Sequence, residues 1–171
     1  MNIDMAVKLS SRAWCVPILS HMHAGIPGRK AQLIAACQAP RNSFSQSLPH
    51  LFDLAVIERT PGHGHPFRPE FRLSEDGIKI AAQAHEIWSQ TQPQHRALLQ
   101  KSWVMPLLLC AQTPRTNKAL KDALTPITDR ALSLILRSLE DAGLLDRNVD
   151  PKARPPRPIY AATIQYSLVD P

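Results

Sequence analysis

Histidine and cysteine are the residues of this chain that could hold a metal ion or perform nucleophilic chemistry. Two histidine pairs stand out, in His21-Met-His23 and in Gly62-His-Gly-His65. A zinc site commonly uses three or four ligands, often with cysteine or carboxylate help, so each pair alone indicates ordinary histidines. Cys15, Cys37 and Cys110 form no CxxC pair, and their odd number argues against a disulfide framework. We therefore expect no metal ion and no cofactor.

No arrangement of side chains in the sequence indicates an enzyme. There is no nucleophile with a neighbouring base, no phosphate-binding loop and no pair of catalytic acids. Cys15 follows a Trp in an apolar segment, so we interpret it as a small core residue. A redox switch at Cys15 is the alternative, and it would need a lowered thiol pKa, for which Arg12 is the one obvious cation nearby.

Length, composition and charge bound the remaining possibilities. The chain has 171 residues, of which 44% are hydrophobic and 20% charged, and this indicates one ordinary folded domain or two small ones. The longest apolar run, residues 104–111, is far shorter than the roughly 18 residues of a membrane span. The N-terminus lacks the order of a signal peptide, so we expect a reducing cytoplasm and no membrane partner. A net charge of +6 favours a polyanionic partner.

A repeated pattern divides the chain into two units. The segment Arg12-Ala-Trp-Cys-Val-Pro-Ile-Leu19 recurs as Lys101-Ser-Trp-Val-Met-Pro-Leu-Leu108, at an offset of 89 residues. Leucine, isoleucine and arginine positions between 48 and 59 match positions between 136 and 147 at an offset of 88. Because the matches keep one register, the sequence predicts two tandem units. The first comprises residues 1–90 with a linker helix from Ser74 to Gln90, and the second comprises residues 91–171.

Both units predict the same order of elements. A helix carries the Trp and the apolar run, a short helix follows (residues 30–37 and 117–124), and a third helix ends near Leu54 or Ala142. Two short strands then enclose a basic loop. Gly143 would end the third helix of the second unit, and Ala55 is a poorer stop at the same place in the first. Pro49 predicts a bend or an early end.

This order is that of a winged helix-turn-helix, a mainly α fold with small β-hairpin wings. The chain resembles the HxlR branch of winged-helix transcription regulators, which is related to the MarR type. The likeness is carried by Trp14 and Trp103 with the aliphatics after them, Phe71-Arg-Leu-Ser-Glu-Asp-Gly77, Leu139-Glu-Asp-Ala-Gly-Leu-Leu-Asp-Arg147, and Arg154-Pro-Pro-Arg-Pro-Ile-Tyr160. The resemblance implies a DNA-binding regulator. The family usually has one such unit per chain and dimerises, whereas this chain has two.

The third helix of a helix-turn-helix enters the major groove, where its polar face reads base edges. In the first unit Phe44, Leu48 and Leu51 form a stripe that predicts a buried face. The polar residues left to face outward are Arg41, Asn42, Ser43, Ser45, Gln46 and Ser47, and all but Ser47 are expected to contact DNA. The basic wings are expected to grip the DNA backbone through Arg68 and Arg72 in the first unit and Lys152, Arg154 and Arg157 in the second.

The third helix of the second unit predicts a different surface. Its buried stripe is Leu132, Leu136 and Leu139, and this places Leu134 and Ile135 where the first unit has Gln46 and Ser47. We expect these two aliphatics to pack against the first unit or another chain. Arg130 and Arg137 could still contact the DNA backbone, whereas Asp129 would repel it.

Three functions stay open at this point. The leading one is a sequence-specific transcription regulator that binds double-stranded DNA. A tandem winged-helix scaffold that bridges proteins, as in chromosome-organisation accessory subunits, is favoured by Leu134 and Ile135. A plasmid-type replication initiator is the third. The two units could form an internal pseudo-dimer within one chain, or two chains could form a homodimer.

Overall fold

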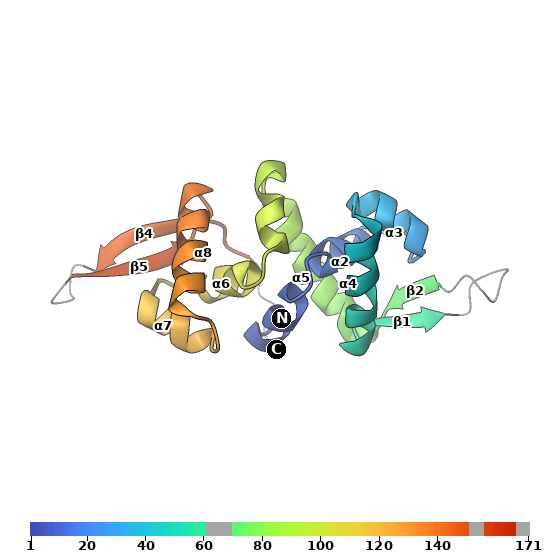
Figure 1. Cartoon of the computed structure of the whole chain (residues 1–171), viewed down its shortest axis with the longest axis horizontal. Coiled ribbons are helices and arrows are strands. Elements are labelled where there is room, and N and C mark those ends of the chain that lie inside the picture. Colours follow the sequence, from blue (N-terminus) through green and yellow to red (C-terminus); the bar gives the residue numbers. More distant parts are fainter. Residues whose placement is uncertain (61–69, 151–155, 167–171) are drawn as a thin grey trace.

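The computed structural model describes residues 1–60, 70–150 and 156–166, and it is mainly helical with two small antiparallel sheets (Figure 1). The first half of the chain forms four helices and a hairpin. These elements are α1 (Ile3–Ser10), α2 (Cys15–His23), α3 (Lys30–Cys37), α4 (Arg41–Asp53), β1 (Ile57–Thr60) and β2 (Glu70–Leu73).

Helix α5 (Glu75–Gln90) connects this half to the next. Its N-cap is Ser74, the residue at which the sequence predicts the linker helix to begin, and the Ser74 Oγ accepts a hydrogen bond from the Gly77 amide at 3.0 Å. The second half, as described, has a 3-10 helix, three α-helices and a hairpin, with one short strand added. Its elements are η1 (Pro93–Gln100), α6 (Val104–Cys110), β3 (Arg115–Thr116), α7 (Asn117–Ala123), α8 (Asp129–Asp141), β4 (Leu145–Asp150) and β5 (Arg157–Ala162).

Trp14 and Trp103, the two tryptophans of the repeated pattern, lie at helix N-caps and not inside the helices that follow. Trp14 is the N-cap of α2, and Trp103 is the N-cap of α6 with a φ of +71°. Each helix therefore begins at the residue after the Trp, whereas the sequence predicts a helix that includes the Trp. The apolar segments that follow are buried in both helices.

Helix α4 continues through Pro49 to Asp53, so the early end expected there is wrong. Proline removes one intrahelical hydrogen bond and crowds the preceding turn. Leu48 and Leu51 are buried on either side of Pro49, while Pro49 itself is exposed. Burial of these flanking leucines holds the last turn in place and offsets the lost hydrogen bond.

Both hairpins gain a third backbone segment on the outer edge of their second strand. In the second half that segment is β3, which pairs with β5 so that Arg115 lies opposite Tyr160. In the first half the carbonyl of Gly28 accepts a hydrogen bond from the Phe71 amide at 2.8 Å. A Cβ at Gly28 would lie 1.7 Å from the Phe71 carbonyl oxygen, so this close approach requires glycine.

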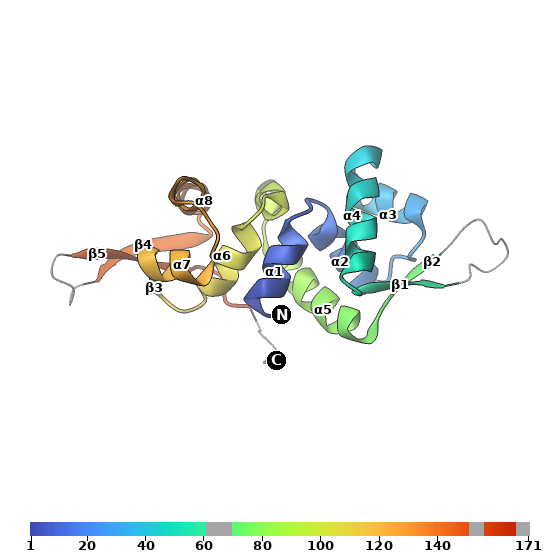
Figure 2. The same cartoon turned by 60° about the horizontal axis from the view of Figure 1, so that its bottom comes forward.

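One continuous core runs through both halves of the chain. Helix α5 packs along α2, and α1 packs against both α2 and α6. Figure 2 shows α1, α5 and α6 in the middle of the molecule, with a hairpin at each end. Ala6 and Leu9 on α1 and Leu107 and Leu108 on α6 are fully buried. The contact between α1 and α6 therefore fixes the two halves relative to each other.

The residues that end α4 and α8 give a matched test of backbone strain. Ala55 has a φ of +55° and Gly143 a φ of +65°, so both adopt the left-handed conformation. A side chain there costs roughly 1–2 kcal/mol, partly offset by the lower entropy of the unfolded chain. We expect Ala55→Gly to raise the free energy of unfolding by about 0.5–1 kcal/mol and Gly143→Ala to lower it by about as much.

Urea denaturation of the two variants measures both changes. A Cβ at Gly143 would meet no atom within 4 Å, so its effect reports the backbone conformation alone. Changes of the same sign in the two variants would contradict the strain assigned to Ala55.

Candidate nucleic-acid interface

Helices α4 and α8 lie on the same side of the molecule. Figure 2 shows both above the central helices, while each hairpin extends toward an end of the long axis. Helix α5 lies on the opposite, lower side in this view. The two third helices therefore lie on one side of the molecule, and the two hairpins lie at its ends.

The outward side of α4 is polar and exposed. The exposed residues include all five of those predicted to contact DNA on this helix: Arg41, Asn42, Ser43, Ser45 and Gln46. Phe44, Leu48 and Leu51 are buried beneath them, as the stripe predicts. The helix therefore exposes donors and acceptors of the types that can pair with guanine and adenine edges.

Ser47 does not face outward, so its placement on the exposed side is wrong. It is only 1% exposed, and its Oγ donates to the Ser43 carbonyl at 3.2 Å. The same hydroxyl accepts a hydrogen bond from the Trp14 amide at 3.3 Å. Ser47 lies three residues after Phe44, within the buried stripe, and it belongs to the packing between α4 and the start of α2.

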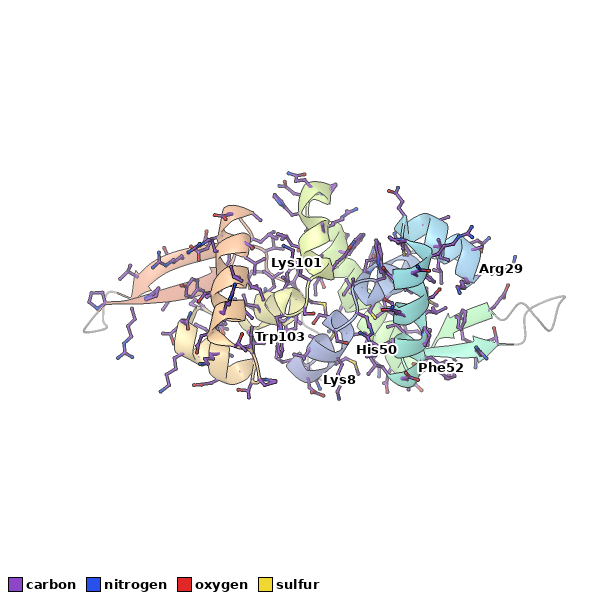
Figure 3. The ribbon with its side chains drawn as sticks, viewed as in Figure 1. Lys8, Arg29, His50, Phe52, Lys101 and Trp103 are labelled. Carbon is purple, nitrogen blue, oxygen red and sulfur yellow. The ribbon has the colours of Figure 1, made fainter. Side chains whose placement is uncertain are left out.

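The last turns of α4 are held by α1 and the turn that follows it. The His50 ring donates from Nε2 to the Lys8 carbonyl at 2.8 Å, and Nε2 lies 3.1 Å from the Ser11 hydroxyl (Figure 3). The Ser11 hydroxyl also donates to the Lys8 carbonyl at 2.7 Å. Since α1 packs on α6, these bonds connect the orientation of α4 to the second half of the chain.

The outward side of α8 differs from that of α4. Leu132, Leu136 and Leu139 are buried as predicted, whereas Leu134 is 55% exposed and faces solvent. The prediction that Leu134 packs against the first half of the chain is therefore wrong. Ile135 is half-buried and packs against the core. The two residues differ because Ile135 lies beside the buried stripe and Leu134 lies opposite it.

The charges along α8 are also arranged differently from what the sequence suggests. Asp129, expected to repel phosphate, pairs with Lys121 at 2.6 Å. This ion pair offsets much of the negative charge at the start of α8. Arg130 and Arg137 are both exposed, one turn before and one turn after Leu134.

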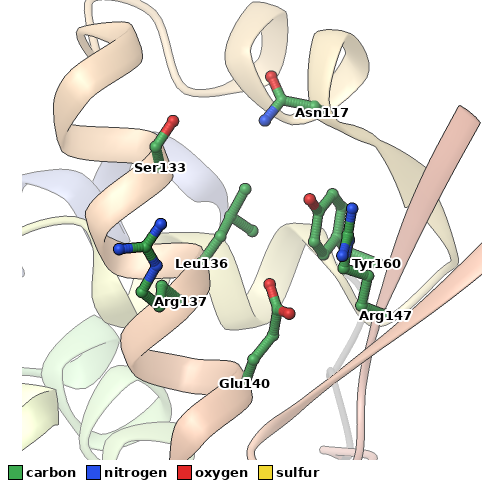
Figure 4. Close-up of a pocket in the computed structure, with 7 residues that line it drawn as sticks. All are labelled: Asn117, Ser133, Leu136, Arg137, Glu140, Arg147 and Tyr160. Carbon is green, nitrogen blue, oxygen red and sulfur yellow. The ribbon is translucent and has the colours of Figure 1, made fainter.

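A pocket of about 260 Å³ lies between α8 and the second hairpin (Figure 4). It is lined by Asn117, Ser133, Leu136, Arg137, Glu140, Arg147 and Tyr160. Arg147 on β4 lies opposite Tyr160 on β5, and this register brings the arginine toward α8. Sequence reasoning named Arg137, Arg147 and Tyr160 separately, and it did not single out Asn117 or Ser133 as site residues. The register of β4 against β5 was the signal that could have placed Arg147 beside Tyr160.

The predicted wing residues fall into two groups. Arg72 lies on β2 and pairs with Glu58 at 2.9 Å, with 67% of its side chain exposed. Arg157 begins β5 and is exposed. Arg68, Lys152 and Arg154, together with His63 and His65, lie outside the described residues. The pairing of Arg72 with Glu58 lowers the positive charge that the first hairpin would offer to DNA.

The cysteines do not form a reactive centre in this fold. Burial raises the pKa of the Cys15 thiol to about 12, against the weaker opposing effects of a Ser47 hydrogen bond and the Arg12 charge. Burial likewise raises the pKa of Cys37 to about 12 and the pKa of Cys110 above its usual value. A thiol with such a pKa carries almost no thiolate at neutral pH, so the geometry favours a core residue over a redox switch at Cys15.

Thiol labelling tests this interpretation. We expect the native chain to react with an aromatic disulfide reagent at pH 7.5 far more slowly than the chain unfolded in guanidinium chloride, since burial suppresses the thiolate. The rate of the native reaction should rise as the pH increases from 7.5 to 9.5. Rapid labelling of Cys15 in the folded chain, located by mass spectrometry and absent from Cys15→Ser, would favour a redox switch at Cys15 over a core residue.

The remaining titratable groups supply no metal centre within the described part of the chain. Burial, followed by the charges of Arg96 and His85, lowers the pKa of His21. No group of three or more histidine, cysteine or acidic side chains among the described residues could hold a metal ion. None of the described helices combines the length and apolar character that crossing a membrane requires.

Residues 98–169 match the family described as HxlR-like helix-turn-helix. The matched segment runs from the end of η1 through β5, which is the second half of the chain. The apo form of wild-type MarR from E. coli is 11% identical, with a TM-score of 0.39, over 81% of this chain and 88% of that one. A cysteine-to-serine mutant of E. coli MarR is 12% identical, with the same TM-score of 0.39, over 74% of this chain and 73% of that one. No curated protein matches the chain.

Proposed function

We propose that this protein is a sequence-specific, DNA-binding transcription regulator built from two tandem winged helix-turn-helix units. The HxlR-like segment at residues 98–169 supports this function for the second unit. The same order of three helices and a hairpin supports it for the first. The observation that carries the proposal is the exposed polar side of α4, set on the same side of the molecule as α8 (Figure 2).

Each part has a separate role in this proposal. Helix α4 enters the major groove and reads bases through Asn42 and Gln46, with Arg41, Ser43 and Ser45 beside them. The wings, through Arg72 and Arg157 and the cations of the two loops, contact phosphates and position the protein. Arg130 on α8 adds a further backbone contact.

The proposed units comprise residues 1–90 and residues 91–171, and they act as an internal pseudo-dimer. Support comes from the contact of α1 with α6 and from the single core that both halves share. A chain of this kind needs no second copy to place two third helices against one duplex.

A salt titration of DNA binding tests the function. The chain should bind the region upstream of its own coding sequence, and the logarithm of the association constant should fall linearly with the logarithm of the salt concentration. Arg157→Ala should weaken binding to all sequences alike and reduce the salt slope by about one unit. Fluorescence anisotropy with a labelled duplex measures both quantities.

Lys79→Ala is the matched control for this test. Lys79 is exposed on α5, a helix that lies on the lower side in Figure 2, whereas α4 lies on the upper side, so loss of Lys79 should leave the salt slope nearly unchanged. Absence of DNA binding even at low salt would contradict the proposed regulator function and favour a scaffold that bridges proteins. A binding site at a replication origin, and not upstream of a gene, would favour the initiator.

A further inference from the structure

We propose that the second unit reads thymine methyl groups through Leu134, so that one chain recognises two unlike half-sites. This inference rests on the proposed DNA-binding function. Leu134 is 55% exposed in the middle of the outward side of α8. The offset of 88 residues puts it in α8 where Gln46 lies in α4.

The neighbours of Leu134 suit nucleic acid. Arg130 and Arg137 lie one helical turn on either side of it, and Ser133 lies next to it. All three are exposed, and Ser133 and Arg137 also line the pocket between α8 and the second hairpin. Under this proposal the two guanidinium groups contact phosphates of the duplex, while the apolar side chain of Leu134 contacts a base edge.

A protein partner would find little to bury on this side of α8. The other large exposed hydrophobic residues in the described part of the chain are Phe52, Ile78 and Val149, which lie on α4, α5 and β4. Leu134 is therefore a single apolar side chain among cations. Interfaces between proteins instead centre on a desolvated cluster with few charges.

Thymine is the base that offers an apolar group in the major groove. Its C5-methyl makes favourable contacts with apolar side chains, whereas glutamine forms paired hydrogen bonds with adenine. Burying one methyl group is worth about a fourfold change in affinity. The first unit would then recognise its half-site by hydrogen bonds, and the second by a methyl contact together with backbone contacts.

Replacement of thymine by deoxyuridine removes only that methyl group. The full chain is first used to select its site from random duplexes, and each thymine of the selected site is then replaced in turn. We expect one or two positions, confined to one half-site, where the replacement weakens binding about three- to tenfold. In Leu134→Ala the same replacement should have no effect, because the contact is already lost.

Gln46→Ala is the matched control, and it should remain sensitive to deoxyuridine at those positions. Leu134 is exposed, so Leu134→Ala should keep the circular dichroism spectrum and unfolding midpoint of the parent chain. Two identical selected half-sites, or equal deoxyuridine effects in Leu134→Ala and the parent chain, would overturn the methyl contact while the regulator function stands. No selected sequence at all would overturn both.

Discussion

The double variant Asn42→Ala, Gln46→Ala should lose sequence-specific DNA binding. Each residue is exposed on the outward side of α4 and can form two hydrogen bonds with adenine. Loss of one such pair costs about 1–3 kcal/mol, so the two together should cost about 2–6 kcal/mol on the selected site. Binding to random DNA should hardly change, because phosphate contacts supply it.

Competition between the selected duplex and random DNA measures this loss as a ratio of affinities. Arg157→Ala provides the contrast, because it should weaken binding to both duplexes and leave their ratio unchanged. A double variant that keeps the full ratio would show that α4 does not read bases. Leu134 and the rest of α8 would then be the remaining candidates for sequence recognition.

Deleting one half-site should reduce affinity by about 100-fold or more. Once one unit is bound, the second meets its half-site as an intramolecular partner, and linked binding of this kind typically adds a factor of 10²–10⁴. The shared core and the packing of α1 on α6 keep the second unit in place, so little ordering entropy opposes its binding. Titration of duplexes with two half-sites or one measures the factor.

Light scattering of the free protein and of its complex completes this test. An internal pseudo-dimer gives a 19.0 kDa species at micromolar concentration and one chain per duplex. Twice that mass in the free protein, with two chains on the duplex, would contradict the internal pseudo-dimer and show a homodimer.

The elements of this fold follow from local patterns in the sequence. The stripes of Leu132, Leu136 and Leu139 on α8 and of Phe44, Leu48 and Leu51 on α4 recur at helical spacing, and both are buried. The N-cap at Ser74 predicts the start of α5 for the same reason, because capping depends on residues only three positions apart. Local signals of this kind can be interpreted without knowing the tertiary structure.

The surface was harder to predict, because it depends on contacts between distant residues. Ser47 is buried by the start of α2, more than 30 positions earlier in the chain, and its hydroxyl is satisfied there by the Trp14 amide. Asp129 is neutralised by Lys121 across the turn between α7 and α8. Leu134 is exposed because no element of the described part of the chain packs over that side of α8, and helical spacing alone does not reveal this.

Under the proposed function, the presence of α4 and α8 on one chain changes how mutations act on DNA recognition. In a homodimer every substitution in the reading helix occurs twice, so both halves of the target must change together. Here Gln46 and Leu134 occupy matching places in one polypeptide and can be altered independently. A single base change in one half of the target can therefore be matched by a single codon change. Under the proposed function, such a protein can acquire new target genes in steps that leave half of its recognition intact.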